Sequence, residues 1–237
     1  MKNKILSAIV ASLFVAAPAA AENLTKEQVE KIVHDYIMNN APVIMESVDN
    51  YQRKSIRDRS EAAIKTNFDA LYKDDESPFI GNPDGDVVMV EFFDYNCGYC
   101  KKVLPTLEQL VTEDKNLKII FKEMPILGPS SELASKWAIA AHKQEKYFPF
   151  HKAMMEHRGP VDEAVLEKIA TAAGVDVARA KKDMEGTEIM LQIEKSRALA
   201  GQVGVSGTPA FVIGDQLFPG ALPVEEMKRL IEEARKK

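Results

Sequence analysis

The feature that most constrains the fold is a seven-residue run, VVMVEFF at 87–93, in which Glu91 is the only charged side chain. Such a run is typical of a central strand that is covered on both faces. Apolar residues at helical spacing follow at 103–111, and a second strand-like segment, LKIIFKE, occupies 117–123. A strand, a helix and a strand in this order predict a parallel pair of strands joined by a crossover helix. The chain is therefore expected to have an α/β fold.

The second half of the chain predicts a helical block inserted into this framework. Residues 130 to about 203 contain several helical segments and no strand signal. A strand returns at 210–213, followed by a turn and a short strand through Phe218. A last helix is expected from about Pro223.

Two helices are expected before the α/β framework. The segment TKEQ at 25–28 is a capping box, which predicts a first helix that runs to about Asn39. A second helix of about 30 residues, longer than is usual in globular proteins, should begin at Pro42 and end near Leu71. Its polar middle at 52–61 suggests a projecting arm whose apolar end needs a partner. We expect self-association, and an arm that folds back on its own domain is the alternative.

A cluster of prolines and glycines marks the expected domain boundary. Breaker residues gather at 77–85, directly before the first strand of the framework. We therefore expect an N-terminal helical oligomerisation region at 22–74 and the α/β domain at 75–237.

The N-terminus matches the three parts of a secretory signal peptide. Lys2 and Lys4 precede an apolar stretch at 5–17, and a run of alanines offers a cleavage site after Ala21. The mature protein is therefore expected in the periplasm, and no later apolar stretch is long enough to span a membrane. The formal net charge of −5 argues against nucleic acid as a partner.

The chain has two cysteines, Cys97 and Cys100, where the first framework strand leads into its helix. A disulfide across two intervening residues closes almost no loop, so the pair is better explained as a reagent than as a stabilising bridge. At a helix N-terminus the backbone N–H groups and the macrodipole stabilise a thiolate. This predicts that Cys97 attacks a disulfide and that Cys100 resolves the mixed disulfide.

Half of a zinc site is the competing interpretation of the two cysteines. Tetrahedral zinc needs further thiolate or imidazole ligands, and the sequence has no other cysteine. The four histidines show no ligand spacing to the pair. We therefore expect neither a metal nor a cofactor.

Two more positions are candidates for the site. Glu91 lies in a strand suited to burial, where a carboxylate is costly. With a raised pKa it would exchange protons with Cys100; alternatively it reaches water or pairs with Lys122 in the neighbouring strand. Pro209 opens a strand, and a cis Thr208–Pro209 bond would turn the Thr208 backbone toward an extended peptide. Because proline bonds are more often trans, composition alone does not favour the cis form.

Three features occur together in an order that resembles DsbA-like thiol:disulfide interchange proteins of the thioredoxin fold. These are the motif FFDYNCGYC at 92–100, the helical insertion, and the segment GTPAFVIG at 207–214. The N-terminal segment is similar to the oligomerisation region of the ScsC-like subgroup. The resemblance implies a nucleophilic Cys97, a resolving Cys100 and a cis Pro209. It also implies that Glu91 is buried near the site, and it therefore reverses the expectation of a trans bond.

The residues between and opposite the cysteines refine this resemblance. The archetypal oxidase has Pro-His between its cysteines and Val before the cis proline, whereas Gly98, Tyr99 and Thr208 are similar to the disulfide isomerase DsbC. Without the histidine a positive charge near the thiolate is lost, which implies a less oxidising site. We expect Gly98, Tyr99, Thr208 and Pro209 to contact substrate.

The resemblance implies a periplasmic thiol:disulfide oxidoreductase that isomerises or forms disulfide bonds in exported proteins. Its partners would be exported cysteine-containing clients, a membrane redox partner that reoxidises or reduces the dithiol, and further copies of the chain. Two alternatives stay open. One is a dedicated disulfide oxidase, and the other is a copper-handling protein, because a dithiol is also a soft ligand for Cu(I).

Overall fold

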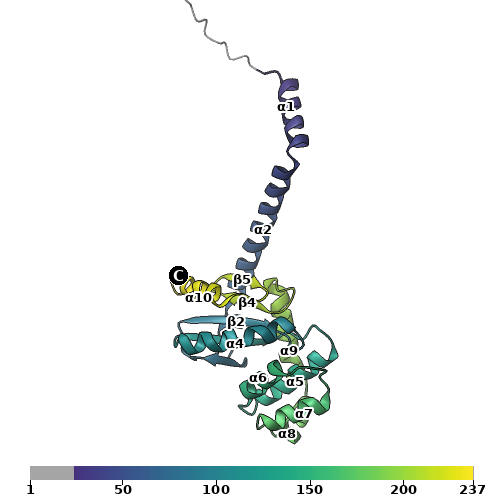
Figure 1. The fold of residues 1–237 in the computed structure, drawn as a ribbon, viewed down its shortest axis with the longest axis vertical. Coiled ribbons are helices and arrows are strands. Elements are labelled where there is room, and N and C mark those ends of the chain that lie inside the picture. The colour runs from purple at the N-terminus through teal and green to yellow at the C-terminus, as the bar shows by residue number, and fades with distance from the viewer. Residues whose placement is uncertain (1–23, 237) are drawn as a thin grey trace, which may run out of the picture. The chain divides into compact units, whose positions relative to one another are not determined.

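A computed structural model of the chain describes residues 24–236, so the expected signal peptide at 1–21 lies outside the described residues. The chain separates into two compact units, of which one ends at Tyr51 and the other starts at Gln52 (Figure 1). Within the described range, no helix is both long enough and apolar enough to cross a bilayer.

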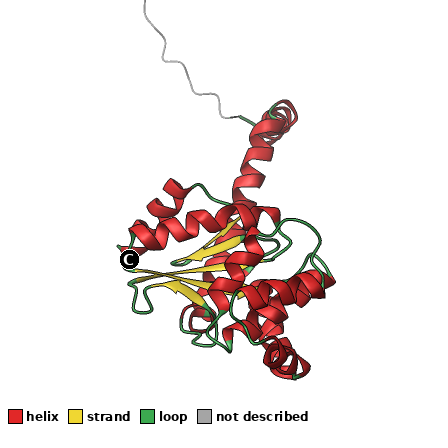
Figure 2. Cartoon of the chain, turned by 60° about the horizontal axis from the view of Figure 1, so that its bottom comes forward, coloured by secondary structure: helices red, strands yellow, loops and turns green. Residues whose placement is uncertain are grey.

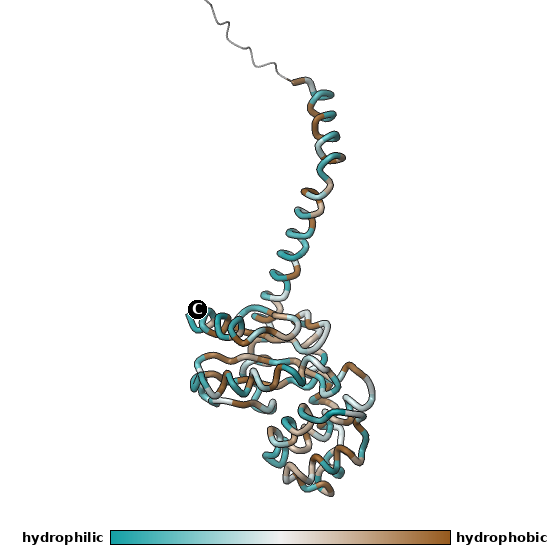
Figure 3. The backbone as a smooth tube through the Cα atoms, in the orientation of Figure 1, coloured by the Kyte–Doolittle hydropathy of each residue, from teal (hydrophilic) through white to brown (hydrophobic). Residues whose placement is uncertain are grey.

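The first unit is helical. Helix α1 (Lys26–Asn39) begins at the predicted capping box, where the Gln28 N–H donates to Thr25 Oγ1 at 3.3 Å and the Thr25 N–H donates to Gln28 Oε1 at 2.8 Å. Helix α2 (Ala41–Thr66) follows after Asn40. Apolar and polar segments alternate along both helices (Figure 3). The exposed apolar side chains here are Val29, Ile32, Val33, Tyr36, Ile37, Met38, Val43, Ile44, Met45, Val48 and Tyr51.

The second helix is shorter than the sequence predicts. It ends at Thr66, and a separate short helix, α3 (Phe68–Tyr72), follows Asn67. The Asn67 side-chain amide donates to the Ala63 carbonyl at 2.9 Å, and φ −103° with ψ 21° takes Asn67 out of helical geometry. The same carbonyl also accepts from the Asn67 backbone N–H at 3.0 Å, so the side chain adds a second donor there, and the helix is interrupted by the backbone angles of Asn67.

The second unit contains a five-stranded sheet in the order β1-β3-β2-β4-β5. Figure 2 shows the strands in yellow among the helices in red. Its strands are β1 (Phe79–Gly81), β2 (Val87–Phe93), β3 (Leu117–Glu123), β4 (Ala210–Ile213) and β5 (Gln216–Pro219). Strands β2 and β3 pair in parallel and the other pairs are antiparallel, so the predicted parallel unit is confirmed. Strand β1 lies inside the predicted breaker cluster and was not predicted. It has three residues, of which one is buried, so the sequence offers no alternation of apolar and polar residues that would indicate a strand.

Helices cover both faces of this sheet. Buried residues of α4 (Gly98–Glu113) and α10 (Val224–Arg235) share one apolar cluster with β2, β3 and β4. The predicted helical insertion contributes to the same cluster and consists of α5 (Pro129–His142), α6 (Tyr147–Glu156), α7 (Glu163–Ala172), α8 (Val177–Glu185) and α9 (Thr187–Val203). In Figure 1, α5 to α8 lie together at the lower end of this unit.

The opposite face of the sheet is covered by α3, α9 and the end of α2. Ile64, Leu71 and Tyr72 pack there with Val203 and with strand residues such as Phe92. The unit that holds the sheet therefore starts at Gln52 and includes residues 52–74, which the sequence analysis assigned to the N-terminal region.

Candidate active site

The site forms where β2 ends and α4 begins. The Cys97 N–H donates to the Asp94 carbonyl at 3.0 Å, which turns the chain, and Cys97 is the N-cap residue of α4. Its φ of −75° and ψ of 113° are those of an extended residue at a helix entry. The predicted placement of Cys97 at a helix N-terminus is therefore confirmed.

The two sulfur atoms differ in access. Both cysteines are free thiols; the Cys97 residue retains 8% exposure and Cys100 retains 1%. The Cys97 Sγ donates to the Thr208 carbonyl at 3.2 Å, although the two residues are 111 positions apart in the sequence. The Thr208–Pro209 bond is cis, as the resemblance implies. Only Cys97 has both an open side and a backbone segment beside it.

Electrostatics separate the thiols further. Hydrogen bonding from the Cys100 side chain, supported by Thr208 and by the backbone N–H groups of Tyr99 and Cys100, lowers the pKa of Cys97 to about 5, against the opposing effect of burial. The pKa of Cys100 is raised, because it donates to Cys97, is buried, and lies near the charge of Glu91. At neutral pH the site therefore holds one thiolate and one thiol.

Glu91 is buried directly behind the dithiol. It is 1% exposed and lies in register between Phe121 of β3 and Phe211 of β4, and its Oε1 has no hydrogen-bond partner. Burial raises the pKa of Glu91 to about 8, with smaller contributions from the charges of Cys97 and Glu123. A carboxyl that titrates near neutral pH can accept and return a proton.

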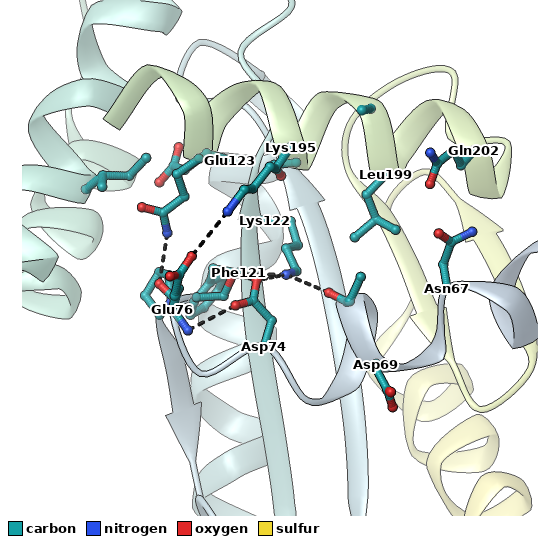
Figure 4. Close-up of a pocket in the computed structure, with 17 residues that line it drawn as sticks. Asn67, Asp69, Asp74, Glu76, Phe121, Lys122, Glu123, Lys195, Leu199 and Gln202 are labelled. Atoms are coloured by element: carbon teal, nitrogen blue, oxygen red, sulfur yellow. Dashed lines mark hydrogen bonds and ion pairs between the residues drawn. The ribbon is translucent and has the colours of Figure 1, made fainter. Parts of the chain in front are cut away.

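The alternative prediction, in which Glu91 pairs with Lys122, is wrong. Lys122 pairs in register with Phe92, so its side chain projects from the other face of the sheet. There its ammonium group donates to Asp74, to Ser77 Oγ at 3.0 Å and to the Ala70 carbonyl at 2.9 Å (Figure 4). These groups border a cavity of about 450 Å³ that lies between α3 and α9.

Gly98 and Tyr99, between the cysteines, face outward. A Cβ added at Gly98 would meet nothing within 4 Å. Tyr99 is 63% exposed, and the Lys102 ammonium group lies 5.3 Å from its ring centroid. Both residues follow Cys97 in the sequence and are exposed. Their contact with substrate stays a prediction.

Sequence reasoning missed Asp94, which organises the surroundings of Cys97. Its carboxylate is fully buried and accepts four hydrogen bonds. The donors are the N–H groups of Asn96 at 2.7 Å, Ile126 at 2.8 Å and Leu127 at 2.9 Å, and Ser131 Oγ at 2.7 Å. Asp94 thus joins the active-site turn to the loop between β3 and α5. An acidic residue between two aromatic ones, in FFDY, was the available signal.

The sequence matches the DSBA-like thioredoxin domain family over residues 88–232. That match spans more than half of the chain and includes the dithiol, Thr208 and Pro209, and the chain therefore belongs to this family. The fold is thioredoxin-like, with the helical insertion that the resemblance implied.

Solved structures agree with this family. A thioredoxin-like oxidoreductase from Silicibacter pomeroyi DSS-3 is 41% identical, with a TM-score of 0.69, over 71% of this chain and 98% of that chain. Proteus mirabilis ScsC in a compact conformation is 29% identical, with a TM-score of 0.67, over 90% of this chain and 100% of that chain. The likeness to ScsC thus reaches into the N-terminal helices.

The curated relatives are of two kinds. A probable disulfide bond formation protein D from Bacillus cereus is 26% identical over 67% of this chain and 78% of its own length. The Na(+)/H(+) antiporter NhaA 1 from Salinispora arenicola is 24% identical over 65% of this chain, but the chain spans only 24% of the antiporter. A match to about a quarter of the antiporter gives no ground for transferring ion transport to this chain.

Proposed function

We propose that the protein is a thiol:disulfide oxidoreductase that isomerises or forms disulfide bonds in exported proteins. The asymmetry of the dithiol carries this proposal. Cys97 has a pKa of about 5 and remains 8% exposed, whereas Cys100 is 1% exposed and has a raised pKa. In this arrangement the Cys97 sulfur can attack a disulfide, and the Cys100 thiol reacts only afterwards, when it resolves the mixed disulfide.

The exchange proceeds in two steps. The Cys97 thiolate attacks a client disulfide, forms a Cys97–client bond, and releases the other client sulfur as a thiolate. In isomerisation the released thiolate attacks a different client disulfide. The client thiolate freed by that attack then displaces Cys97 from the mixed disulfide, which forms a new client disulfide and restores the Cys97 thiolate. Alternatively, Cys100 gives its proton to the Glu91 carboxylate and attacks Cys97. The client sulfur then leaves as a thiolate and the Cys97–Cys100 disulfide is formed, so the client is reduced. Disulfide formation is the reverse: a client thiolate attacks Cys97 of the Cys97–Cys100 disulfide, Cys100 leaves and takes a proton from Glu91, and a second client thiolate displaces Cys97.

Thr208 and Pro209 are proposed to hold the client backbone. The Thr208 carbonyl lies 3.2 Å from Cys97 Sγ, so a client cysteine bonded to Cys97 would lie next to this segment. An extended client peptide can pair with exposed backbone in the manner of an added strand. Gly98 leaves open space next to the nucleophile for such a peptide.

The isomerase activity is favoured by the residues around the thiolate. The CGYC motif has no histidine between the cysteines, and without that positive charge the reduced form is less strongly stabilised. A less oxidising dithiol takes electrons from client thiols less strongly, which favours exchange over net oxidation. Because its reduced form is also less favoured at a given redox poise, a reducing partner would have to maintain the free thiolate from which isomerisation starts. The reducing equivalents, or the oxidising ones for disulfide formation, would come from a membrane redox partner.

Self-association through the N-terminal helices is part of the proposal. The apolar side chains of α1 and early α2 are exposed in the single chain, which leaves a large apolar surface in contact with water. An assembly of several copies would cover it and would surround one client with several thiols. The signal-peptide pattern at 1–21 supports a periplasmic location for the proposed activity.

Refolding of a scrambled, disulfide-containing protein tests both parts of the proposal. Cys97→Ala should abolish recovery of the native client. Ile32→Glu combined with Tyr36→Glu should give monomers that still reduce small disulfides but lose client refolding. His34→Glu, an exposed site off that helical face, is the matched control. Full refolding activity in a monomeric double variant would remove the helices from the mechanism.

The two alternatives predict different results. A dedicated oxidase would hold its cysteines mostly oxidised in the periplasm, whereas an isomerase would hold them mostly reduced, and alkylation of periplasmic extracts distinguishes the two. A copper-handling protein would lose metal tolerance with Cys97→Ser while Cys100→Ser still forms mixed disulfides. Among residues 24–236, the structure contains no group of three or more histidine, cysteine or acidic side chains placed to hold a metal ion.

A further inference from the structure

A second buried carboxyl group lies beside Glu91. Glu123, at the end of β3, is 4% exposed. In the parallel register Glu91 is opposite Phe121 and Phe93 is opposite Glu123, so the two acids lie diagonally on adjacent strands. Alternation along the strands directs both side chains to the sheet face that α4 and the insertion cover. The two carboxyl groups therefore share one buried environment.

Neutral hydroxyl groups surround Glu123. Oε1 accepts from Tyr147 at 3.0 Å and from Tyr95 at 3.3 Å, and Oε2 accepts from Ser135 at 2.7 Å. These donors come from α6, from the β2–α4 turn and from α5, respectively. The Tyr95 hydroxyl group also lies 3.1 Å from Nδ1 of His151.

The remaining titratable neighbours bring no positive charge. His151 is fully buried, its Nε2 has no partner, and burial lowers its pKa to about 3, so it is neutral at pH 7. Asp94, in the turn after β2, adds a negative charge. Lys122 precedes Glu123 in the chain but projects from the opposite face. The named groups that face Glu123 are therefore neutral or acidic.

Two acids in one apolar region without a cation cannot both ionise easily. Each negative charge raises the cost of the other, so the protons leave in steps that belong to the pair. Burial raises the pKa of Glu123 to about 8, with the charge of Asp94 acting in the same direction and the three hydroxyl donors opposing. Glu123 thus titrates over the same range as Glu91.

We propose that Glu123 is a positioning residue for disulfide exchange: it shares a buried negative charge with Glu91 and so sets the pH at which Glu91 can take the proton of Cys100. This rests on the proposed function, in which the Cys100 S–H proton moves to the Glu91 carboxylate. The Cys100 electron pair then forms the bond to Cys97, and the Cys97–client bond breaks. With Glu123 protonated, Glu91 ionises readily; with Glu123 ionised, Glu91 keeps its proton.

Stopped-flow reaction of the reduced, full-length protein with excess 5,5′-dithiobis-(2-nitrobenzoic acid) tests the proposal. Attack by Cys97 releases the first thionitrobenzoate, and resolution by Cys100 releases the second. We expect Glu123→Gln to lower the pH midpoint of the second-phase rate by about half a unit to one unit, because a like charge has been removed. The pH dependence of that rate should also become narrower and follow the titration of a single proton. The first phase should persist.

The Glu91→Gln variant shows whether Glu123 acts through Glu91. If Glu123 acts through Glu91, the double variant Glu91→Gln/Glu123→Gln has the same second-phase profile as Glu91→Gln alone. A shift that persists in that background, or an unchanged profile in Glu123→Gln, overturns the inference. Loss of the first phase from the wild-type protein would instead overturn the proposed function.

A second variant keeps the test valid if Glu123→Gln does not fold. Tyr147→Phe retains the ring and removes the 3.0 Å hydrogen bond that stabilises the ionised form of Glu123. Glu123 then stays protonated to higher pH, and the second-phase midpoint should move in the same downward direction by a smaller amount. An unchanged or upward-moving midpoint in a folded Tyr147→Phe protein contradicts the proposal.

Discussion

Lys122 and Glu123 are consecutive residues of β3, and both are buried, but their side chains lie on opposite faces of the sheet and have different partners. On the α3 and α9 face, the Lys122 ammonium group is matched by a carboxylate, a hydroxyl group and a carbonyl (Figure 4). On the dithiol face, Glu123 and Glu91 have no cation among the named neighbours, and burial raises the pKa of both to about 8. A satisfied ion pair stabilises the fold, whereas an unmatched acid pair is kept close to its titration range.

The largest effect is expected on the dithiol face. Cys97→Ser removes the ionised sulfur, and a serine hydroxyl group is not a nucleophile toward disulfides under these conditions. Exchange with a small disulfide should fall to the background rate. At pH 4, where the wild-type Cys97 thiol is protonated in both the folded and the unfolded chain, the denaturant midpoint should stay close to that of the wild type. Any first-phase release of thionitrobenzoate from the folded variant would show that Cys100 can attack, contrary to its burial and raised pKa.

The opposite result is expected on the other face. Lys122→Met leaves the Asp74 carboxylate and Ser77 without their shared donor. Loss of one partner of a buried pair should cost about 3 kcal/mol of unfolding free energy, the low end of the usual range because the Asp74 side chain is 28% exposed. Urea denaturation measures this loss. The first-phase rate of the folded variant should equal that of the wild type. A slower first phase with unchanged stability would mean that the two faces are not separate.

The same comparison shows what the sequence could and could not provide. The runs at 87–93 and 117–123 predicted β2 and β3 with their observed ends, and the position of Cys97 at the start of α4 followed from them. The sequence did not predict the register in which β2 and β3 pair. Glu91 is opposite Phe121 rather than Lys122, and a shift of one residue moves a side chain to the other face of the sheet.

The missed polar groups have a common physical reason. Asp94 is joined to Ser131, 37 residues away, and Glu123 to Tyr95, 28 residues away, so their partners come from other elements. Periodicity reports which face of one element is buried and carries no information on contacts between distant segments. The break at Asn67 was missed because it consists of a change in the backbone angles of one residue, which leaves the helical spacing of the apolar residues on either side unchanged.

A smaller effect is expected on the pH dependence of stability. The pKa of Glu91 rises from its usual value of 4.5 to about 8 in the folded chain. Below pH 4.5 both states are protonated; between 4.5 and 8 only the unfolded chain loses its proton, so stability falls as pH rises. Glu91→Gln should remove this part of the fall and be about 2 kcal/mol more stable than wild type at pH 6, relative to pH 4. Urea titrations across this range measure the difference.

The smallest effect is expected at the edge of the dithiol face. Thr208→Val keeps the backbone carbonyl that lies 3.2 Å from Cys97 Sγ but removes the hydroxyl group, and hydrogen bonding from Thr208 is one of the lesser causes of the low pKa of Cys97. The pKa of Cys97 should rise by about half a unit to one unit, which the ultraviolet absorbance of the thiolate reports against pH. Because the main cause is the Cys100 side chain, Cys100→Ala should raise the pKa of Cys97 further than Thr208→Val does. The reverse ranking would mean that the Thr208–Pro209 segment, rather than the partner thiol, controls the pKa of Cys97.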